Sequence, residues 1–273
     1  MKQKVEKYYD RVAGRYDDTY ERSPYWDFYR RVTWEHFKPF LPREAHARVL
    51  DAGGGTGPWA LRLHKAGFRV TLSDLSDGML ERARRRFAEA GIAADALPIV
   101  RADITDLEPF ADASFDLVLA QGDPLSYSSH PAKAMKSIDR VLAPGGVLVA
   151  SVDAKYGGID HWFQKKDVAG LEKFLRDGRT EWLAHDRKER FPLTMFSPDE
   201  LTALVRARGF EVLSLAGKLV LPVRQWPELL EDKEAFARLL RLELSLHREP
   251  ALLGRASHLE IVARKPAADG GAS

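Results

Sequence analysis

The stretch Arg48-Val-Leu-Asp-Ala-Gly-Gly-Gly-Thr-Gly57 decides the fold. Two apolar residues, Val49 and Leu50, lead into the acid Asp51, and a glycine-rich run follows before a helical pattern starts at Pro58. This order predicts a buried strand, a tight turn and a helix. Glycines in such a turn permit positive φ angles and let a ligand approach the backbone, while the helix N-terminus presents free N–H groups. The stretch therefore predicts a site for a nucleotide-like ligand.

The spacing of the glycines argues against a dinucleotide. The fingerprint G-x-G-x-x-G would place its third glycine at position 58, which is Pro58. The glycines fall instead at Gly53, Gly55 and Gly57, behind Asp51. A carboxylate at that point would repel a pyrophosphate but suits a ligand that carries a positive amino group. NAD(P) is therefore disfavoured as the ligand.

Short apolar runs alternate with helical stretches on both sides of this turn. The predicted strands cover residues 48–51, 68–74, 97–103, 115–120, 146–152, 210–215 and 258–263. Strand and helix in alternation predict an α/β fold, in which a mostly parallel, doubly wound sheet has helices on both faces. Right-handed crossovers place the carboxyl ends of parallel strands at one edge. The acids that end the first three strands should therefore meet in one ligand crevice.

Each acid has a chemistry that suits a nucleoside. Asp74 ends the second strand, where its carboxylate can accept hydrogen bonds from both hydroxyls of a ribose. Asp103 ends the third strand beside Ile104, where it can meet the amino group of an adenine. The fourth strand delivers Gln121 and Asp123 to the same edge, next to the reactive part of such a ligand.

The ordered set of motifs resembles the class I S-adenosylmethionine-dependent methyltransferase family over roughly residues 8–152. The glycine motif matches residues 51–57, and the ribose and adenine acids match Asp74 and Asp103. The resemblance implies a Rossmann-like sheet of seven strands whose last strand, His258–Ala263, is antiparallel. It implies S-adenosylmethionine as the cofactor, and it places Tyr16, from the segment Tyr8–Asp17, near the methionine end. The predicted cofactor residues are Tyr16, Asp51, Gly53, Gly55, Gly57, Asp74, Leu75, Met79, Asp103, Ile104 and Gln121.

The rest of the chain divides around this core. We expect residues 1–42 to form an N-terminal helical segment over the active site, and residues 43–154 and 197–265 to form the two parts of the core. Residues 155–196, rich in aromatic and charged side chains, predict a helical insertion that acts as a cap, and residues 266–273 predict a disordered tail. Loops at this edge carry specificity in α/β enzymes. The candidate walls of the acceptor pocket are Tyr127, Tyr156, His161 and Trp162.

Composition limits the other possibilities. The chain has 273 residues and no cysteine, so it has no thiolate nucleophile and no zinc-thiolate site. Its eight histidines are scattered without an i,i+4 pair, and we expect no metal. No apolar run is long enough for a membrane span, and the N-terminus lacks the apolar core of a signal peptide, so we expect a cytoplasmic protein without a membrane partner. A formal net charge of +2 gives no electrostatic reason to expect nucleic acid.

The predicted reaction is direct in-line SN2 transfer of a methyl group to a small-molecule acceptor by a monomer or homodimer. The sequence identifies neither the accepting atom, which can be O, N, S or C, nor a general base. Three alternatives stay open. The first is an NAD(P)-dependent oxidoreductase. The second is a nucleic-acid methyltransferase, although Asp123-Pro-Leu-Ser-Tyr127 lacks the adjacent prolines typical of that class. The third is a module that binds the cofactor without catalysis.

Overall fold

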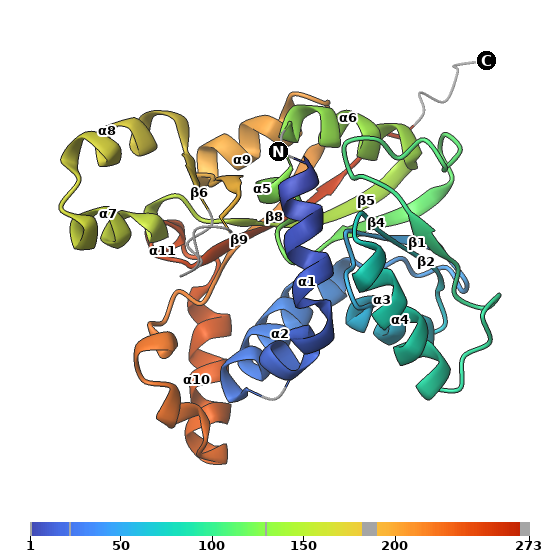
Figure 1. Ribbon diagram of the computed structural model, residues 1–273, viewed down its shortest axis with the longest axis horizontal. Coiled ribbons are helices and arrows are strands. Elements are labelled where there is room, and N and C mark those ends of the chain that lie inside the picture. Colours follow the sequence, from blue (N-terminus) through green and yellow to red (C-terminus); the bar gives the residue numbers. More distant parts are fainter. Residues whose placement is uncertain (1, 22, 129, 182–189, 268–273) are drawn as a thin grey trace.

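A seven-stranded sheet forms the centre of the molecule (Figure 1). The computed structural model describes residues 2–21, 23–128, 130–181 and 190–267. The strand order is β3-β2-β1-β4-β5-β9-β8, in which β1 to β5 are parallel and β9 is antiparallel to both of its neighbours. The strands are β1 (Arg48–Ala52), β2 (Arg69–Asp74), β3 (Ile99–Arg101), β4 (Phe115–Ala120), β5 (Leu142–Asp153), β8 (Glu211–Lys218) and β9 (His258–Arg264). The predicted doubly wound fold with an antiparallel last strand is confirmed.

Helices cover both faces of this sheet because its strands are apolar on both sides. In β4, Leu117 and Leu119 belong to one hydrophobic cluster, and Val118 and Ala120 belong to the other. The first cluster packs under α3 (Pro58–Lys65) and α4 (Asp77–Glu89). The second packs under α6 (Pro131–Val141) and α9 (Pro198–Arg206). Figure 1 shows these two helix layers on opposite sides of the sheet.

The strand order reverses direction between β1 and β4. From β1 the chain builds outward through β2 to β3, whereas β4 lies on the other side of β1 and continues to β5. At such a switch point the two connecting loops diverge and leave a crevice beyond the carboxyl ends of the strands. The glycine turn after β1 and the Gln121–Asp123 turn after β4 therefore flank one opening.

Two N-terminal helices lie beside this opening. They are α1 (Lys2–Glu21) and α2 (Pro24–Phe37), and α1 packs along α4. The apolar face of α2 contains Phe28 and Val32, both fully buried. These side chains pack against α10 (Lys233–Leu246) and the 3-10 turn Pro227–Leu230 that precedes it. The helix α10 therefore supports the N-terminal segment from outside.

The insertion differs in part from the prediction of a helical segment. It contains α7 (Ile159–Lys165) and α8 (Val168–Asp177), followed by a hairpin of β6 (Arg179–Glu181) and β7 (Pro192–Thr194). Gly178 adopts a φ of 66°, which ends α8 and turns the chain into β6. Residues 182–189 between these strands lie outside the described residues, as do residues 268–273 of the predicted tail. Two further short α-helices of the described residues are α5 (Pro124–Tyr127) and α11 (Pro250–Leu253).

Candidate active site

A cavity of about 620 Å³ opens beyond the carboxyl ends of β1, β2 and β4. Its size is typical of a site for a small ligand. The glycine turn and the start of α4 line one part, and α1, α2 and α5 line the other. Of the residues predicted from the sequence, those that line the cavity are Tyr16, Gly53, Gly55, Asp74, Leu75, Met79, Asp103, Ile104, Gln121 and Tyr127.

Two glycines shape the turn at the cavity wall. Gly53 and Gly55 have φ angles of 73° and 56°, in the left-handed region that L side chains avoid. A Cβ atom on Gly53 would lie 2.8 Å from Cβ of Pro124, so this glycine permits the close approach of α5. A Cβ atom on Gly55 would meet no heavy atom within 4 Å, because this position faces the open cavity. The backbone at Gly55 is therefore available to a ligand.

The carboxylate of Asp74 is fixed at the end of β2. It accepts hydrogen bonds from the backbone N–H groups of Gly55 and Ser76, each at 2.9 Å. Burial raises the pKa of this carboxyl, although the two N–H groups oppose the effect. Each oxygen can accept a further bond, so Asp74 can take the two hydroxyls of a ribose as predicted.

Asp103 and Ile104 lie farther along the same wall. Asp103 accepts a hydrogen bond from the backbone N–H of Thr105 at 2.9 Å, which fixes its side chain in the turn after β3. Ile104 is 8% exposed and presents an apolar surface beside it. An apolar surface with an adjacent acceptor suits the flat face and the amino group of an adenine. The open space beside Gly55 and the carboxylates of Asp74 and Asp103 together fit S-adenosylmethionine.

Two predicted cofactor residues do not line the cavity. Asp51 is fully buried beneath the turn, and a Cβ on Gly54 would lie 2.6 Å from its Oδ2. No hydrogen bond of normal geometry from the described residues reaches either of its oxygens, and burial raises its pKa to about 7. Gly57 precedes α3 with a φ of 79°, and a Cβ there would lie 2.6 Å from the Phe87 ring. Asp51 lies beneath the turn and Gly57 faces α4, so neither residue lines the cavity.

The helix α1 is held over the cavity by two of its acids. Asp10 accepts hydrogen bonds from Oγ of Ser76 at 2.6 Å and from the backbone N–H of Gly78 at 3.0 Å. A side chain on Gly78 would have little room, since a Cβ would lie 3.1 Å from the Asp10 backbone. This contact joins α1 to the first turn of α4, directly beside the cavity.

The second acid, Asp17, lies about two helical turns farther along α1. It accepts a hydrogen bond from Oγ1 of Thr56 in the glycine turn at 2.7 Å. Its oxygens also lie 2.9 Å from Arg82 and 3.0 Å from Arg86, both on α4. These contacts place the neighbouring Tyr16 in the cavity lining.

Aromatic side chains form the wall that α1, α2 and α5 contribute. Tyr16 stacks on Tyr20 with ring centroids 4.4 Å apart, and Tyr20 contacts Trp26 at 4.7 Å. On α2, Trp26 contacts Tyr29 at 5.4 Å. Of these aromatic side chains, only Tyr16 was predicted individually from the sequence as a site residue. Their spacing is the signal, because residues three, four and seven apart lie on one helix face. The second group in this wall comprises Tyr8, Tyr9 and Tyr127.

The predicted cap residues of the insertion lie away from the cavity. None of Tyr156, His161 and Trp162 is in its lining. Tyr156 is 45% exposed, and Trp162 packs on Phe174 within the insertion, at 5.7 Å between ring centroids. The helices α7 and α8 form their own small cluster and project from the sheet on the side away from α3 and α4 (Figure 1). These three side chains, predicted as walls of the acceptor pocket, therefore do not line this cavity.

One residue of the insertion does support the wall from behind. Phe191 is fully buried and contacts Tyr8 at 5.2 Å and Tyr127 at 5.6 Å between ring centroids. It touches two residues that line the cavity without lining it itself. The insertion therefore acts through the packing of Tyr8 and Tyr127.

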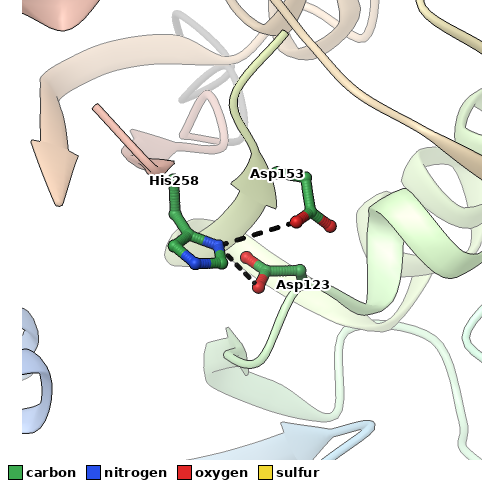
Figure 2. A group of neighbouring side chains, drawn as sticks. All are labelled: Asp123, Asp153 and His258. Atoms are coloured by element: carbon green, nitrogen blue, oxygen red, sulfur yellow. Dashed lines mark ion pairs between the residues drawn. The ribbon is translucent and has the colours of Figure 1, made fainter. Parts of the chain in front are cut away.

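Two carboxylates and an imidazole meet at the floor of the aromatic part (Figure 2). Nδ1 of His258 lies 3.0 Å from Oδ2 of Asp123 and 3.9 Å from Oδ1 of Asp153. Asp123 follows β4 with a φ of 65°, Asp153 is the last residue of β5, and His258 is the first of β9. We call these three residues the acid–histidine cluster. Asp123 and His258 line the cavity, and Asp153 lies buried behind them.

Mutual charge decides the ionisation of this cluster. Burial would raise the pKa of Asp123, but His258 and Lys218 outweigh it and hold that pKa below its usual value. Burial raises the pKa of Asp153 to about 7, and the negative charge of Asp123 adds to this shift. Burial would lower the pKa of His258, but Asp123 more than offsets it, so the net shift is upward. Asp123 and His258 are therefore an ion pair near neutral pH, and Asp153 titrates there.

A second buried polar group lies directly beneath the cluster. The Glu260 carboxylate is fully buried, 2.6 Å from Nδ1 of His36, and it accepts a hydrogen bond from Nε2 of Gln121 at 2.6 Å. Lys218 donates to Oε1 of Gln121 at 3.1 Å and lies 3.5 Å from Glu260. The amide of Gln121, predicted as a cofactor contact, is thus bonded at both ends within the protein.

Sequence reasoning missed His258, Asp153 and Glu260. It treated His258 as a scattered histidine at the start of a strand, because nothing near it in the sequence marks it. The signal exists only in the sheet, where His258 is the cross-strand partner of Asp153. The sequence separation, more than a hundred residues, hides this pairing.

Comparisons with known proteins find similarity to methyltransferases. Residues 49–146 match the family described as "Methyltransferase domain". The tRNA 5-carboxymethoxyuridine methyltransferase of Escherichia coli (strain K12) is 26% identical over 223 residues, which cover 80% of each chain. The ubiquinone/menaquinone biosynthesis C-methyltransferase UbiE of Laribacter hongkongensis is 38% identical over 147 residues, 52% of this chain and 55% of that protein.

Solved structures share the fold. A SAM-dependent methyltransferase from Methanosarcina mazei superposes with a TM-score of 0.59 at 19% identity, and the match covers 85% of this chain and 98% of that one. Among the helices of the described ranges, none is long and apolar enough to cross a membrane. The family match and the glycine turn set aside the oxidoreductase alternative, and the cofactor is S-adenosylmethionine. Over residues 49–146 this chain is therefore similar to the methyltransferase-domain family, and its fold is that of the class I S-adenosylmethionine-dependent methyltransferases.

Proposed function

We propose that this enzyme methylates a small organic acceptor that binds among the aromatic side chains of the cavity. The observation that carries the proposal is the composition of that wall. Seven aromatic side chains from α1, α2 and α5 line it: Tyr8, Tyr9, Tyr16, Tyr20, Trp26, Tyr29 and Tyr127. Such surfaces bind flat or apolar molecules, and they also attract cations.

The cofactor half of the cavity has a separate set of residues. The backbone at Gly55, the carboxylate of Asp74 and the Asp103–Ile104 pair would hold S-adenosylmethionine. When bound, this cofactor supplies an activated methyl group on a positive sulfur. The chain's own contribution is to orient the acceptor and exclude water, which provides much of the rate in a reaction of this kind. The helix α1, held by Asp10 and Asp17, covers the site.

The charge of the lining supports a small acceptor over a polyanion. Among the described residues that line the cavity, Arg30 is the only arginine, and there is no lysine. That arginine is committed elsewhere, because it donates a hydrogen bond to the backbone carbonyl of Tyr20 and pairs with Asp27 at 3.9 Å. Proteins that bind nucleic acid usually neutralise phosphates with several basic side chains.

A nucleotide of tRNA is the second candidate acceptor. The observation in its favour is the relative named tRNA 5-carboxymethoxyuridine methyltransferase, which matches four fifths of this chain. The expectation from the sequence that nucleic acid is excluded was based on the net charge of +2, and this similarity does not support it. A flipped base would occupy the same aromatic wall, since bases stack on aromatic side chains.

The test is the release of S-adenosylhomocysteine with four groups of acceptors. Purified enzyme and S-adenosylmethionine are incubated with a panel of small amines, a panel of phenols, a panel of carboxylic acids, or total tRNA. We expect turnover with a member of one small-molecule panel. Turnover with tRNA alone would show that the second candidate is correct, and no turnover with any group would contradict both.

A further inference from the structure

The acid–histidine cluster has no role yet in the proposed reaction. It lies at the floor of the aromatic part of the cavity, where the acceptor would bind. It is deeply buried, because Asp123 is 3% exposed and Asp153 is 7% exposed. Oδ1 of Asp123, Oδ2 of Asp153 and Nδ1 of His258 form no hydrogen bond of normal geometry with the described residues, although Nδ1 lies 3.0 Å from Oδ2 of Asp123. Buried carboxylates are costly, so such an arrangement calls for a function.

The imidazole has two distinct edges. Nδ1 is buried and faces both carboxylates, and Figure 2 shows the other ring nitrogen pointing away from them. The side chain of His258 retains 17% of its accessible surface and lines the cavity. Because Nδ1 is buried, the exposed surface of the side chain belongs to the other atoms of the ring. The ring edge contacts Tyr29, at 5.3 Å between centroids.

We propose that His258 is the general base of this methyltransferase and takes the proton of the acceptor's nucleophilic atom on Nε2. Asp123 and Asp153 are positioning residues, because they hold the proton of the neutral imidazole on Nδ1 and stabilise the imidazolium that forms. This assignment rests on the proposed function, and it deepens it: the acceptor is a molecule whose methylated atom carries a proton, such as an amine or a hydroxyl compound.

The step balances without any further reactant. The acceptor atom uses a lone pair to form a bond to the methyl carbon while the carbon–sulfur bond breaks, and sulfur keeps that electron pair. The proton on the acceptor atom passes to Nε2 of His258. The imidazolium then releases one proton to water, so the net products are the methylated acceptor, S-adenosylhomocysteine and a proton. A carboxylate that orients an imidazole in this way is a recurring arrangement in proton transfer.

The groups around the imidazole set the pH range in which it can act. On β8, Lys218 opposes protonation of His258, whereas Asp123 and Asp153 favour it. Tyr29 on α2 contributes an uncharged ring, because burial raises its pKa well above the ordinary value. The net pKa of His258 is raised, so the neutral base accumulates only as pH rises through that value. Turnover should therefore increase with pH and level off on the alkaline side.

A divalent cation between the three side chains is the competing interpretation, since one ligand atom from each lies within 4.8 Å of the others. The geometry favours a proton. One oxygen of each carboxylate faces Nδ1 in Figure 2, and the positive charges already present, on His258 and Lys218, lower the pKa of Asp123. A cation would have to displace the Nδ1 proton from the ion pair.

The first measurement requires no acceptor. ¹⁵N NMR of the imidazole nitrogens, recorded from pH 6 to 10 on the full-length protein, reports the tautomer of neutral His258. We expect the proton on Nδ1, with an unprotonated Nε2, and we expect the Asp153→Asn variant to alter that tautomer balance or lower the pKa. A neutral form that carries its proton on Nε2 would overturn the proposal, whatever the acceptor panels show.

The second measurement uses the small acceptor that gives turnover. His258→Ala should lower kcat about 100-fold or more, as expected for loss of a general base, with less than a threefold change in the S-adenosylhomocysteine Kd. The pH dependence described above should disappear, and added imidazole should restore part of the rate. The control His46→Asn changes an exposed histidine of a distant loop and should leave the pH profile unchanged. An unchanged profile in His258→Ala would overturn the proposal.

Metal binding is tested in the same samples. We expect that treatment with a chelator leaves kcat unchanged and that Mn²⁺, added alone, does not bind tightly. Tight binding of Mn²⁺ that Asp153→Asn abolishes would overturn the base assignment in favour of a metal site. Absence of turnover with every acceptor, together with the Nδ1 tautomer, would contradict the proposed function and leave the predicted state of His258 established.

Discussion

Gly55 and Gly91 share a left-handed backbone but face different surroundings. Their φ angles are 56° and 74°, and a Cβ on either would meet no heavy atom within 4 Å. Gly55 faces the cavity, whereas Gly91 lies on an exposed turn after α4. Alanine at either position should cost about 1–2 kcal/mol of unfolding free energy, because the left-handed region is unfavourable for L residues.

Only the Gly55→Ala variant should also lose ligand. A methyl group there would occupy the space in which the backbone meets the cofactor, and we expect the Kd for S-adenosylhomocysteine to rise about tenfold or more, equivalent to about 1.4 kcal/mol. Isothermal titration calorimetry of both variants gives the comparison. Equal losses of affinity in Gly55→Ala and Gly91→Ala would show that backbone strain, and not contact with the ligand, is responsible.

Asp51 makes the stability of the ligand-free protein depend on pH. Burial raises its pKa from 3.8 to about 7, so the folded state favours the protonated form more than the unfolded state does. The fold is therefore most stable at low pH with respect to this group, and stability is lost as pH rises from about 4 to about 7. A shift of about three units corresponds to on the order of 4 kcal/mol.

Asp51→Asn should remove that pH dependence. Urea unfolding at pH 4.5, 6 and 8 should show that the variant gains stability relative to the native chain as pH rises. Asp95→Asn, at an exposed loop position, is the matched control and should give a constant difference. A constant difference for Asp51→Asn as well would mean that the buried carboxylate ionises normally.

At the scale of elements, α1 depends on Asp17 for its position over the cavity. Asp17→Asn keeps an acceptor for Thr56 but removes the charge that faces Arg82 and Arg86. Hydrogen bonds between charged groups contribute about 1.5–3 kcal/mol. We expect faster hydrogen exchange in α1 and weaker binding of S-adenosylhomocysteine, because Tyr16 and Tyr20 lose their support. Lys4→Gln, an exposed change on the same helix, should affect neither measurement.

The elements that the sequence predicts well are those with a local signal. The strands that end in Asp51 and Asp74 are short apolar runs bounded by turn residues, and the structure has a strand at each. The hairpin of β6 and β7 was not predicted, because each strand has three residues and no alternating pattern. The acid–histidine cluster could not be predicted either, since it exists only through the pairing of β5 with β9.

At the scale of the whole molecule, the net charge limits the affinity for tRNA. The chain carries a formal net charge of +2, and its cavity has one arginine in the described lining. If the acceptor is a small molecule, the Kd for total tRNA should lie in the range of non-specific complexes, about 10⁻⁴–10⁻⁶ M. Fluorescence anisotropy at several salt concentrations measures this. A nanomolar Kd at physiological salt would favour tRNA as the acceptor.

The position of β9 between β5 and β8 gives its residues one further effect. His258 and Glu260 are two residues apart, so they lie on the same face of the strand. In the observed register His258 pairs with Asp153 and Lys218, and Glu260 pairs with Ser151 and Ala216.

A slip of β9 by one residue would turn both charged groups to the opposite face, into an apolar layer. A slip by two residues, in the direction that sets Glu260 against Asp153, would bring a third carboxylate to two buried ones and remove the imidazole from between them. Each misaligned pairing therefore carries a large electrostatic penalty, whereas the native pairing sets His258 beside Asp123 and Lys218 beside Glu260. The residues that are proposed to take part in proton transfer thus also help to fix the register of β9 in the sheet.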